Sequence, residues 1–156
     1  MGVISTPHGD IETPAFVPVA TRATVRTLDT EEIEDVGSQV LIANTYHLAL
    51  TPGEEIVKKF GGIHGYMKWK RPLMTDSGGF QVYSLGFGKD HGIGKILKEQ
   101  PKEQFGDRNM QPVNVKITED GVHFRSPIDG KEHYVGPKES IKIQEALGAD
   151  SMCAFD

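Results

Sequence analysis

The stretch "QVLIANTYHLALTPGEEIVKKFGGIHGYMKWKRPLMTD", residues 39–76, decides the fold. It opens with a short apolar and β-branched run that ends at Asn44, and "PLMTD" repeats such a run before Asp76. Between them, "TPGEEIVKKFGG" predicts a helix, with Pro52 near its start and glycines at its end. Strand, helix and strand in this order indicate parallel strands joined by a helical crossover.

The same alternation extends in both directions along the chain. At the N-terminus, "GVIST" and "IETPAFVPVA" flank the turn-like "PHGD", which predicts a hairpin whose second arm runs into a buried strand over residues 16–20. In "LDTEEIEDVG", Asp29 and Glu32 have the spacing of a capping box and Gly37 ends the predicted helix. Towards the C-terminus, "GPKESIKIQEALG" predicts a helix and "SMCAF" a fourth strand.

These elements predict an α/β fold with a parallel sheet, either doubly wound or a β/α barrel. Four strand–helix units would make the N-terminal half of a (β/α)8 TIM barrel, preceded by the β-hairpin. The segment 87–135 interrupts the alternation, and it contains a pattern typical of a β-hairpin around residues 119–121. We therefore place this segment as an excursion after the third strand.

Composition limits the class of protein. The chain has 156 residues, of which 37% are hydrophobic and 25% charged, as in one ordinary globular domain. It has neither an apolar stretch of roughly 20 residues nor a signal-peptide pattern, so we expect a cytoplasmic protein without a membrane partner. The net charge of −5 argues against indiscriminate coating of nucleic acid. Residues 56–75 lack acids and carry five basic residues, which indicates a phosphate-contacting surface or simply a solvated basic face.

Two acidic residues share one structural position. Asp76 ends the third predicted strand and Asp156 the fourth, and ligands of parallel α/β folds bind at the carboxyl ends of strands. The alternative is that each acid only caps the helix after it. Gly78 and Gly79 would let backbone N–H groups approach a ligand, and Phe80 offers a face to a planar ring. A carboxylate matches adjacent donors such as those of guanine, so we infer a planar, donor-rich heterocycle as ligand.

Other chemistries are not supported by spacing. Ser77 has no histidine placed by a hydrolase motif. The six histidines show no i, i+4 metal pair, and His47 is interpreted as a supporting hydrogen-bonding residue. The sequence therefore assigns no metal ligand.

At "MTDSGGFQVYSLG" the chain resembles the tRNA-guanine transglycosylase family, also called queuine tRNA-ribosyltransferases. The stretches "TPHGDIETPAFVPVATRATV", "NTYHLALTPG", "GGIHGYMKW", "GVHFRSPIDG" and "GADSMCAFD" are similar to further family signatures. The similarity covers nearly the whole chain except about residues 87–113, and "FRSPIDG" favours the bacterial type.

The resemblance implies a β/α barrel enzyme of queuosine biosynthesis that exchanges guanine at the tRNA wobble position for a 7-deazaguanine through a covalent ribosyl-enzyme intermediate. It implies that Asp76 is the catalytic general acid/base. It also implies that Asp76, Ser77, Gly78, Gly79 and Phe80 line the base pocket, and that Asp156 reads the donor edge of the base. The expected partners are tRNA and guanine or the 7-deazaguanine, which is the aminomethyl precursor or queuine.

The chain resembles only the N-terminal part of the family. The nucleophilic aspartate and the cysteine and histidine ligands of the family's zinc do not match any of its segments. We therefore expect residues 1–156 to form a partial barrel domain with an atypical insertion at about 87–113. We expect these residues alone to bind no zinc and to be inactive, whereas the full-length protein would carry zinc and form a homodimer.

Two alternatives remain open at this level. A non-catalytic tRNA-binding or partner subunit could keep the same barrel without turnover. A glycoside hydrolase with paired carboxylates would fit the acids but not the Gly-Gly-Phe platform.

Overall fold

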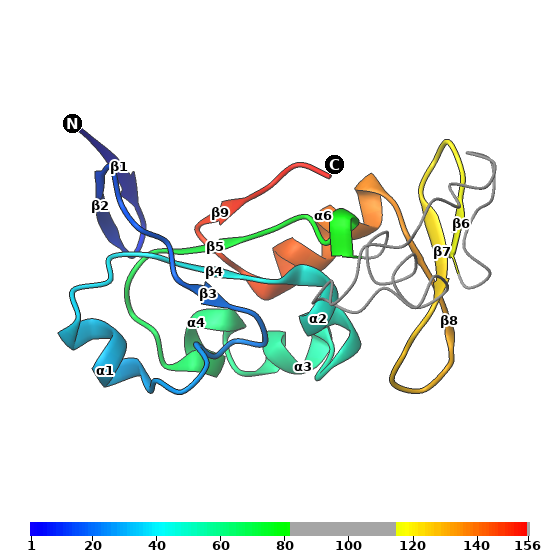
Figure 1. Cartoon of the computed structure of the whole chain (residues 1–156), viewed down its shortest axis with the longest axis horizontal. Helices are drawn as coiled ribbons and strands as arrows, with labels where there is room; N and C mark the ends of the chain where they lie inside the picture. The colour runs from blue at the N-terminus through cyan, green and yellow to red at the C-terminus, as the bar shows by residue number, and fades with distance from the viewer. Residues whose placement is uncertain (82–114, 156) are drawn as a thin grey trace, which may run out of the picture.

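A parallel four-stranded sheet forms the centre of the molecule. In the computed structural model, which describes residues 1–81 and 115–155, its strands are β3 (Val19–Ala20), β4 (Leu41–Ala43), β5 (Leu73–Thr75) and β9 (Ser151–Met152). They lie side by side in the order in which they occur along the chain, and all neighbouring pairs are parallel. The strands run in one direction across Figure 1, with the helices gathered along them. This arrangement confirms a mixed α/β fold built on a parallel sheet.

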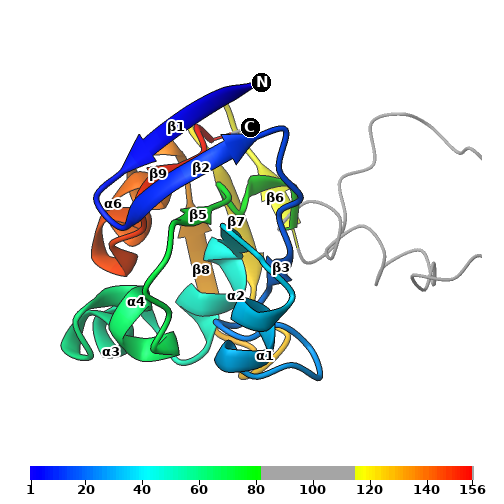
Figure 2. The ribbon, with the colours of Figure 1, turned by 90° about the vertical axis from the view of Figure 1, so that its left-hand side faces the viewer.

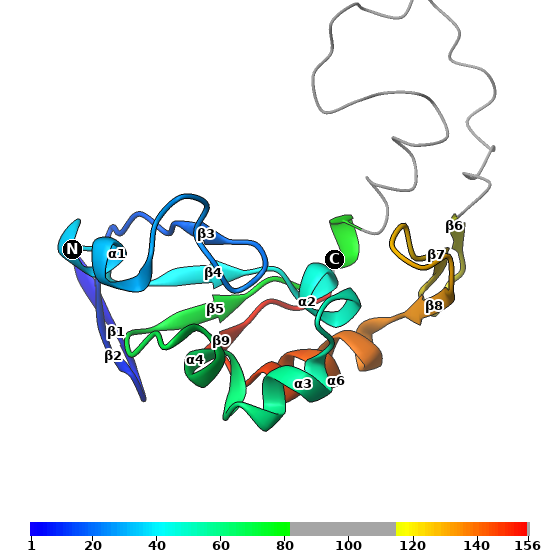
Figure 3. The ribbon, with the colours of Figure 1, turned by 90° about the horizontal axis from the view of Figure 1, so that it is seen from below.

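Helices cover one face of this sheet. They are α1 (Thr30–Asp35), α2 (Thr45–Leu50), α3 (Glu54–Lys59), α4 (Gly62–Met67) and α6 (Pro137–Leu147). Leu41, Ala43 and Leu73 of the sheet are at most 1% exposed and belong to one apolar cluster with Val57, Ile63 and Leu147 of the helices. Figure 3 shows α3, α4 and α6 packed along this side. Burial of these aliphatic side chains is the main force that holds helices to the sheet.

The opposite face of the sheet is less covered by the residues that the structure describes. The paired residues Val19, Ile42 and Met74 lie in one row across the strands. Ile42 and Met74 are only half-buried, and Val19 is 60% exposed. The prediction of a buried strand over 16–20 was wrong in extent, because only Val19 and Ala20 pair with β4 and Phe16 is 85% exposed.

Two antiparallel sheets flank the parallel one. Strands β1 (Gly2–Thr6) and β2 (Gly9–Thr13) pair with each other and lie across the amino ends of the parallel strands, as Figures 1 and 2 show together. At the other end, β6 (Val115–Ile117), β7 (Val122–Arg125) and β8 (Glu132–Val135) form a three-stranded sheet. The sequence indicates the β6–β7 pair around 119–121 but not the addition of β8. The predicted insertion at 87–113 lies outside the described residues.

Local signals in the sequence explain several helix boundaries. The Asp29 side chain accepts from Glu32 N at 2.8 Å and the Glu32 carboxylate accepts from Asp29 N at 2.9 Å, which confirms the capping box of α1. The single helix predicted between the second and third strands is three short helices, α2, α3 and α4, of six residues each. No helix in the described ranges is long and apolar enough to cross a membrane.

Candidate active site at the carboxyl ends of β4 and β5

Asp76 and Asn44 occupy equivalent positions on neighbouring strands. Each follows the last residue of its strand, and the register pairs those last residues, Ala43 and Thr75. The Asp76 N–H continues the ladder by donating to the Ala43 carbonyl at 3.1 Å. The sequence placed Asp76 at the carboxyl edge of the sheet, and the structure adds Asn44 beside it.

The Asp76 carboxylate is fixed by the residues that follow β4. Its Oδ1 accepts from the Thr45 backbone N–H at 2.9 Å, and its Oδ2 accepts from the Asn44 side-chain amide. The Thr45 hydroxyl donates to the Asp76 carbonyl at 2.5 Å. Both carboxylate oxygens and the backbone of Asp76 are therefore tied to the first turn of α2, while the residue as a whole stays half-buried. Such donors set the orientation of a carboxylate that has to meet a substrate.

Asn44 also organises α2. Its side-chain oxygen caps the helix by accepting from the His47 N–H at 3.0 Å, and it lies 2.6 Å from His47 Nδ1. These contacts leave the Asn44 amide nitrogen facing Asp76. The interpretation of His47 as a supporting hydrogen-bonding residue is thereby confirmed.

Close packing explains the glycine that follows Asp76 and Ser77. Gly78 has φ +80, and a Cβ built there would lie 3.0 Å from Tyr46 N and 3.3 Å from Tyr46 Cβ. A side chain at this position would meet both an unfavourable backbone conformation and the first turn of α2. Ser77 is 4% exposed, whereas Phe80 is 63% exposed. Ser77, Gly78 and Gly79 therefore form a buried bend after Asp76 that delivers Phe80 to the surface.

A buried polar network supports this bend from α6. Gln144 is fully buried; its Oε1 accepts from the Thr75 hydroxyl at 2.8 Å, and its amide donates to Ser140 Oγ and to the Cys153 carbonyl. The Ser140 hydroxyl in turn donates to the Ser77 carbonyl at 2.7 Å. This network joins β5, α6 and the segment after β9, so the position of the bend depends on all of them.

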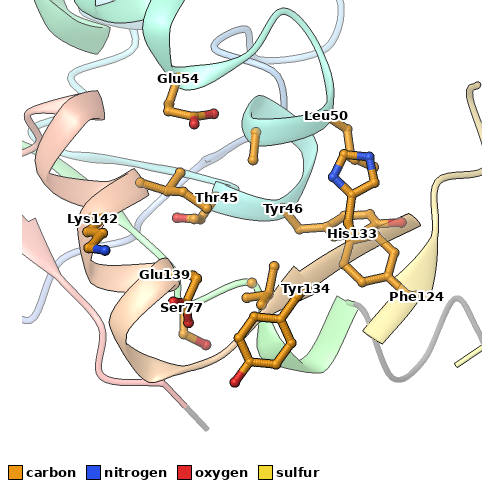
Figure 4. A pocket seen from close by; sticks show the side chains of 14 residues that line it. Thr45, Tyr46, Leu50, Glu54, Ser77, Phe124, His133, Tyr134, Glu139 and Lys142 are labelled. Carbon is orange, nitrogen blue, oxygen red and sulfur yellow. The ribbon is translucent and has the colours of Figure 1, made fainter. Parts of the chain in front are cut away.

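A cavity of about 370 Å³ lies beside the bend but does not include Asp76 or Phe80. As Figure 4 shows, it is bounded by α2, by the β7–β8 sheet and by α6, with Tyr46, Phe124 and His133 on one side and Glu139 and Lys142 on the other. Burial raises the pKa of Tyr46, which keeps its phenol neutral. His133 Nε2 is buried and lacks a hydrogen-bond partner among the described residues.

The comparisons with known proteins cover the whole chain. The family model described as "Queuine tRNA-ribosyltransferase" matches residues 1–156. The chain belongs to this family. It is 46% identical to the queuine tRNA-ribosyltransferase of Fusobacterium nucleatum over 155 residues, which are 99% of this chain and 35% of that protein.

Other relatives give the same result. The queuine tRNA-ribosyltransferase of Moorella thermoacetica is 46% identical over 156 residues, covering 100% of this chain and 35% of the relative. That of Herpetosiphon aurantiacus is 47% identical over 155 residues, covering 99% of this chain and 33% of the relative. The chain thus spans about a third of the length of the curated queuine tRNA-ribosyltransferases that it matches.

Within this chain, the predicted site residues are only partly brought together. Asp76, Ser77, Gly78, Gly79 and Phe80 directly follow β5, with a bend at Gly78 and a helical conformation at Gly79 and Phe80. Asp156 lies outside the described residues. The chain leading to it runs along β5 as far as Cys153, whose N–H donates to the Thr75 carbonyl at 3.0 Å. The shared pocket of Asp76 and Asp156 therefore stays a prediction.

The sequence reading missed the residues that hold Asp76. Asn44 and Thr45 hydrogen-bond to Asp76 from the end of the neighbouring strand. Ser140 and Gln144, on a helix more than sixty residues further along the chain, hydrogen-bond to the residues on either side of it, Ser77 and Thr75. The available signal was the position of Asn44 at the end of its own predicted strand, directly comparable with that of Asp76.

A second polar cluster lies at the opposite end of the same sheet. Asp150, directly before β9, has a side chain that is 2% exposed and contacts His8 Nδ1 at 2.7 Å and His64 Nε2 at 3.1 Å. Burial raises the pKa of Asp150, but hydrogen bonds from His8 and Leu73 and the charges of both histidines outweigh it, so the pKa is lowered overall. Burial and the nearby His8 lower the pKa of His64 against the opposing effect of Asp150.

Proposed function

We propose that the protein catalyses tRNA-guanine transglycosylation, the exchange of guanine at the anticodon wobble position for a 7-deazaguanine in queuosine biosynthesis. One observation carries the proposal: the Asp76 carboxylate is held at the carboxyl end of β5 by Thr45 N–H and the Asn44 amide. A carboxylate fixed in this way can exchange a proton with a base without reorienting. Membership of the queuine tRNA-ribosyltransferase family supports the choice of reaction.

In the proposed reaction Asp76 moves the protons. As the bond between ribose and guanine breaks, Asp76 assists departure of the guanine as general acid. The ribose is held as a covalent intermediate on a further aspartate, which we do not assign to any residue of 1–156. The incoming base then gives a proton to Asp76 and forms the new bond to ribose, which frees the nucleophile. Two displacements of this kind retain configuration at the sugar carbon.

The base would bind beside Asp76. We infer that Ser77, Gly78 and Gly79 line its pocket, that Phe80 stacks on the ring, and that Asp156 accepts from the donor edge of the base. The 63% exposure of Phe80 supports a role in stacking, because its ring face is accessible. The target nucleotide would have to be turned out of its stack to reach this position. In this scheme Asp156→Asn relaxes the choice of base more than it slows the exchange.

The architecture supports the barrel expected of the family. The four parallel strands follow one another in chain order, helices cover one face, and β3 and β9 are the outer strands. We propose that this sheet is one half of a (β/α)8 barrel, whose interior face carries Ile42 and Met74. We further propose that the complete protein works in the cytoplasm as a homodimer.

The zinc site that the resemblance implies uses cysteine and histidine ligands, and the cysteine of this chain does not fit such a site. Cys153 belongs to no group of three potential metal ligands in the ranges that the structure describes. No step of the proposed reaction is therefore assigned to a metal ion.

The proposal is tested with the complete gene product that contains this chain. Unmodified tRNA and labelled guanine are incubated with it, and label incorporated into tRNA is measured beside tRNA binding in a gel-shift assay. We expect incorporation at the wobble position. Binding of tRNA without incorporation would overturn the enzymatic proposal.

That outcome would instead support the second candidate, a non-catalytic tRNA-binding subunit of the same fold. Its supporting observation is the exposure of Lys58, Lys59, Lys68 and Lys70 in the basic segment that runs through α3 and α4. Exposed lysines can contact phosphates whether or not the site is active. Truncating these side chains to alanine would then weaken tRNA binding and reduce its salt dependence.

A further inference from the structure

Three potential metal ligands converge at the amino end of the parallel sheet. His8 lies in the turn between β1 and β2, His64 lies in α4, and Asp150 precedes β9. Their potential ligand atoms all lie within 4.8 Å of one another, although they come from segments far apart in the sequence. The cluster is at the opposite end of the strands from Asp76, because the hairpin covers the end where the strands begin (Figures 1 and 3).

We propose that His8, His64 and Asp150 form a binding site for a divalent transition-metal ion such as zinc. Two imidazole nitrogens and one carboxylate are an established ligand set for such ions, with one or more positions left open to water. The open side faces solvent at His8, whose side chain is 40% exposed, whereas those of His64 and Asp150 are 10% and 2% exposed. An ion can therefore enter past His8 and rest on the two buried ligands.

The buried carboxylate is oriented before any ion arrives. Asp150 Oδ2 accepts from the Leu73 N–H at 2.9 Å, and the Asp150 N–H donates to the Leu73 carbonyl at 2.9 Å. Both bonds anchor Asp150 to the start of β5. Hydrogen bonds of this type fix ligating carboxylates in metal sites and are as characteristic as the ligands themselves.

The surroundings of His64 follow the same pattern. Its Nε2 faces Asp150, and the ring also makes a hydrogen bond to the Gly148 backbone. A ligating histidine usually donates its second ring N–H to a carbonyl or carboxylate, which leaves the other nitrogen with a lone pair for the metal. With the ring proton held towards Gly148, the Nε2 lone pair could bind an ion, which would replace the present 3.1 Å hydrogen bond to Asp150.

Metal binding requires a small rearrangement of His8. The His8 and His64 rings are stacked, with centroids 3.7 Å apart and planes 12° apart, and the nitrogen–oxygen distances of 2.7 and 3.1 Å are those of hydrogen bonds. Around a zinc ion with bonds of about 2.0–2.1 Å, neighbouring tetrahedral ligand atoms lie about 3.3 Å apart. The exposed His8 ring must therefore rotate out of the stack, while His64 and Asp150 move only a few tenths of an ångström.

The sequence gives no hint of this site, because its ligands do not share a helix face or a short motif. The expectation that residues 1–156 bind no zinc rested on two observations: the family's cysteine and histidine ligands match no segment of the chain, and the histidines form no i, i+4 pair. A bound ion would link the β1–β2 hairpin to α4 and to the start of β9. This role is independent of the base-exchange proposal, which concerns the other end of the sheet.

The test is a titration of the EDTA-treated and dialysed protein with ZnCl2 by isothermal calorimetry, repeated with Co2+ to read the visible absorption of the bound ion. The protein titrated is the chain of residues 1–156, which does not contain the cysteine and histidine ligands of the family's zinc. We expect it to bind one ion per chain, with a cobalt spectrum typical of mixed nitrogen and oxygen ligands. His64→Ala and His8→Ala should each weaken binding by about tenfold or more. His123→Ala is the matched control, because His123 on β7 also lies near a carboxylate, 3.8 Å from Glu132 on β8, and the described part of the chain adds no third ligand to this pair.

A variant can bind less zinc because it is less stable or because it lacks a metal ligand. Measuring thermal unfolding with and without zinc distinguishes the two causes. Zinc should raise the unfolding midpoint of the wild type and of His123→Ala but not that of His8→Ala, whose replaced side chain is the most exposed of the three. Equal zinc affinity of the wild type and His8→Ala would overturn the proposal. Absence of stoichiometric zinc binding by the wild type would overturn it as well. The cluster would then serve only to hold the hairpin to the sheet by hydrogen bonds.

Discussion

The two ends of the parallel sheet each carry one aspartate, and the two are held by different kinds of donor. Asp76, after β5, accepts from a side-chain amide and a backbone N–H, neither of which changes charge with pH. Asp150, before β9, accepts from the Leu73 N–H and contacts two imidazoles that can lose or gain a proton. In the proposed reaction the amide donors would orient Asp76 for proton transfer, whereas the two imidazoles beside Asp150 supply the nitrogen ligands of the proposed cation site.

The difference extends to the surroundings of the two residues. Asp76 remains half-buried, while the side chain of Asp150 is 2% exposed beneath the hairpin. A group that must meet a substrate needs access, whereas a carboxylate that joins segments can be buried because its hydrogen-bond partners offset the cost of removing it from water. These surroundings fit the proposal that base exchange takes place at the carboxyl end of the sheet and that the cluster at the amino end joins segments of the fold.

The largest expected effect comes from Asp76→Asn in the complete protein. The substitution keeps the shape of the side chain but removes its capacity to exchange a proton. Guanine exchange should fall by about 10²- to 10⁴-fold, while tRNA binding in a gel shift stays within about twofold. Asp10→Asn, in the exposed hairpin strand β2, is the control and should leave the exchange rate unchanged. An Asp76→Asn rate within a few-fold of the wild type would remove the acid/base assignment.

Asp150→Asn should cost stability instead of activity per folded molecule. The amide keeps one acceptor but places N–H groups where the carboxylate met its donors, so we expect a loss of about 3 kcal/mol in the free energy of unfolding. Urea denaturation measures it, with Asp129→Asn as the control in an exposed turn. A loss no larger than that of the control would show that the Asp150 cluster does not hold the hairpin end together.

Substitutions at two glycines can distinguish the cost of close packing near Asp76 from the cost of an unfavourable backbone conformation. Gly78 and Gly37 have nearly equal φ values of +80 and +78, but a Cβ would meet Tyr46 N at 3.0 Å at Gly78 and nothing within 4 Å at Gly37. Gly37→Ala should cost about 1 kcal/mol of unfolding free energy from the left-handed conformation alone. Gly78→Ala should cost about 1–2 kcal/mol more, because the bend must move away from α2. Equal losses of unfolding free energy for the two variants would mean that the bend moves away from α2 at no cost.

The smallest expected effect is that of His8→Ala in metal-free buffer. The contact of His8 with Asp150 is short at 2.7 Å, but the side chain is 40% exposed and therefore partly screened by water. We expect a loss of about 0.5–1 kcal/mol in urea denaturation, well below that of Asp150→Asn. If His8→Ala and Asp150→Asn lost equal unfolding free energy, His8 would be the dominant partner of Asp150. This result would contradict the larger contribution expected from the buried donors.

The parts of the fold that depend on local sequence could be predicted. The Asp29–Glu32 capping box lies within one turn of helix, and the alternation of apolar runs with helical segments placed β4, β5 and α6 correctly. The three six-residue helices between β4 and β5 could not be separated, because each is too short to hold the apolar repeat at i, i+3, i+4 and i+7 that predicts a helix. The strand after the hairpin was overestimated because apolar composition does not distinguish exposed Phe16 from buried Ala20.

Contacts between distant segments set the limit for the sites. Asp76 could be found from its place after a strand, but its hydrogen bonds to Asn44 and Thr45 depend on the register of β4 and β5. The convergence of His8, His64 and Asp150 depends on how the hairpin and α4 fold onto the sheet, which no sequence spacing encodes. Sequence patterns thus indicate which residues can act, and the topology decides which of them meet.

The most direct test of the account is a crystal structure of the complete protein with bound guanine. We predict that the base lies at the carboxyl end of β5, stacked on Phe80 and within hydrogen-bonding distance of the Asp76 carboxylate. Guanine bound instead in the cavity lined by Tyr46, His133 and Glu139, away from Asp76, would contradict the account.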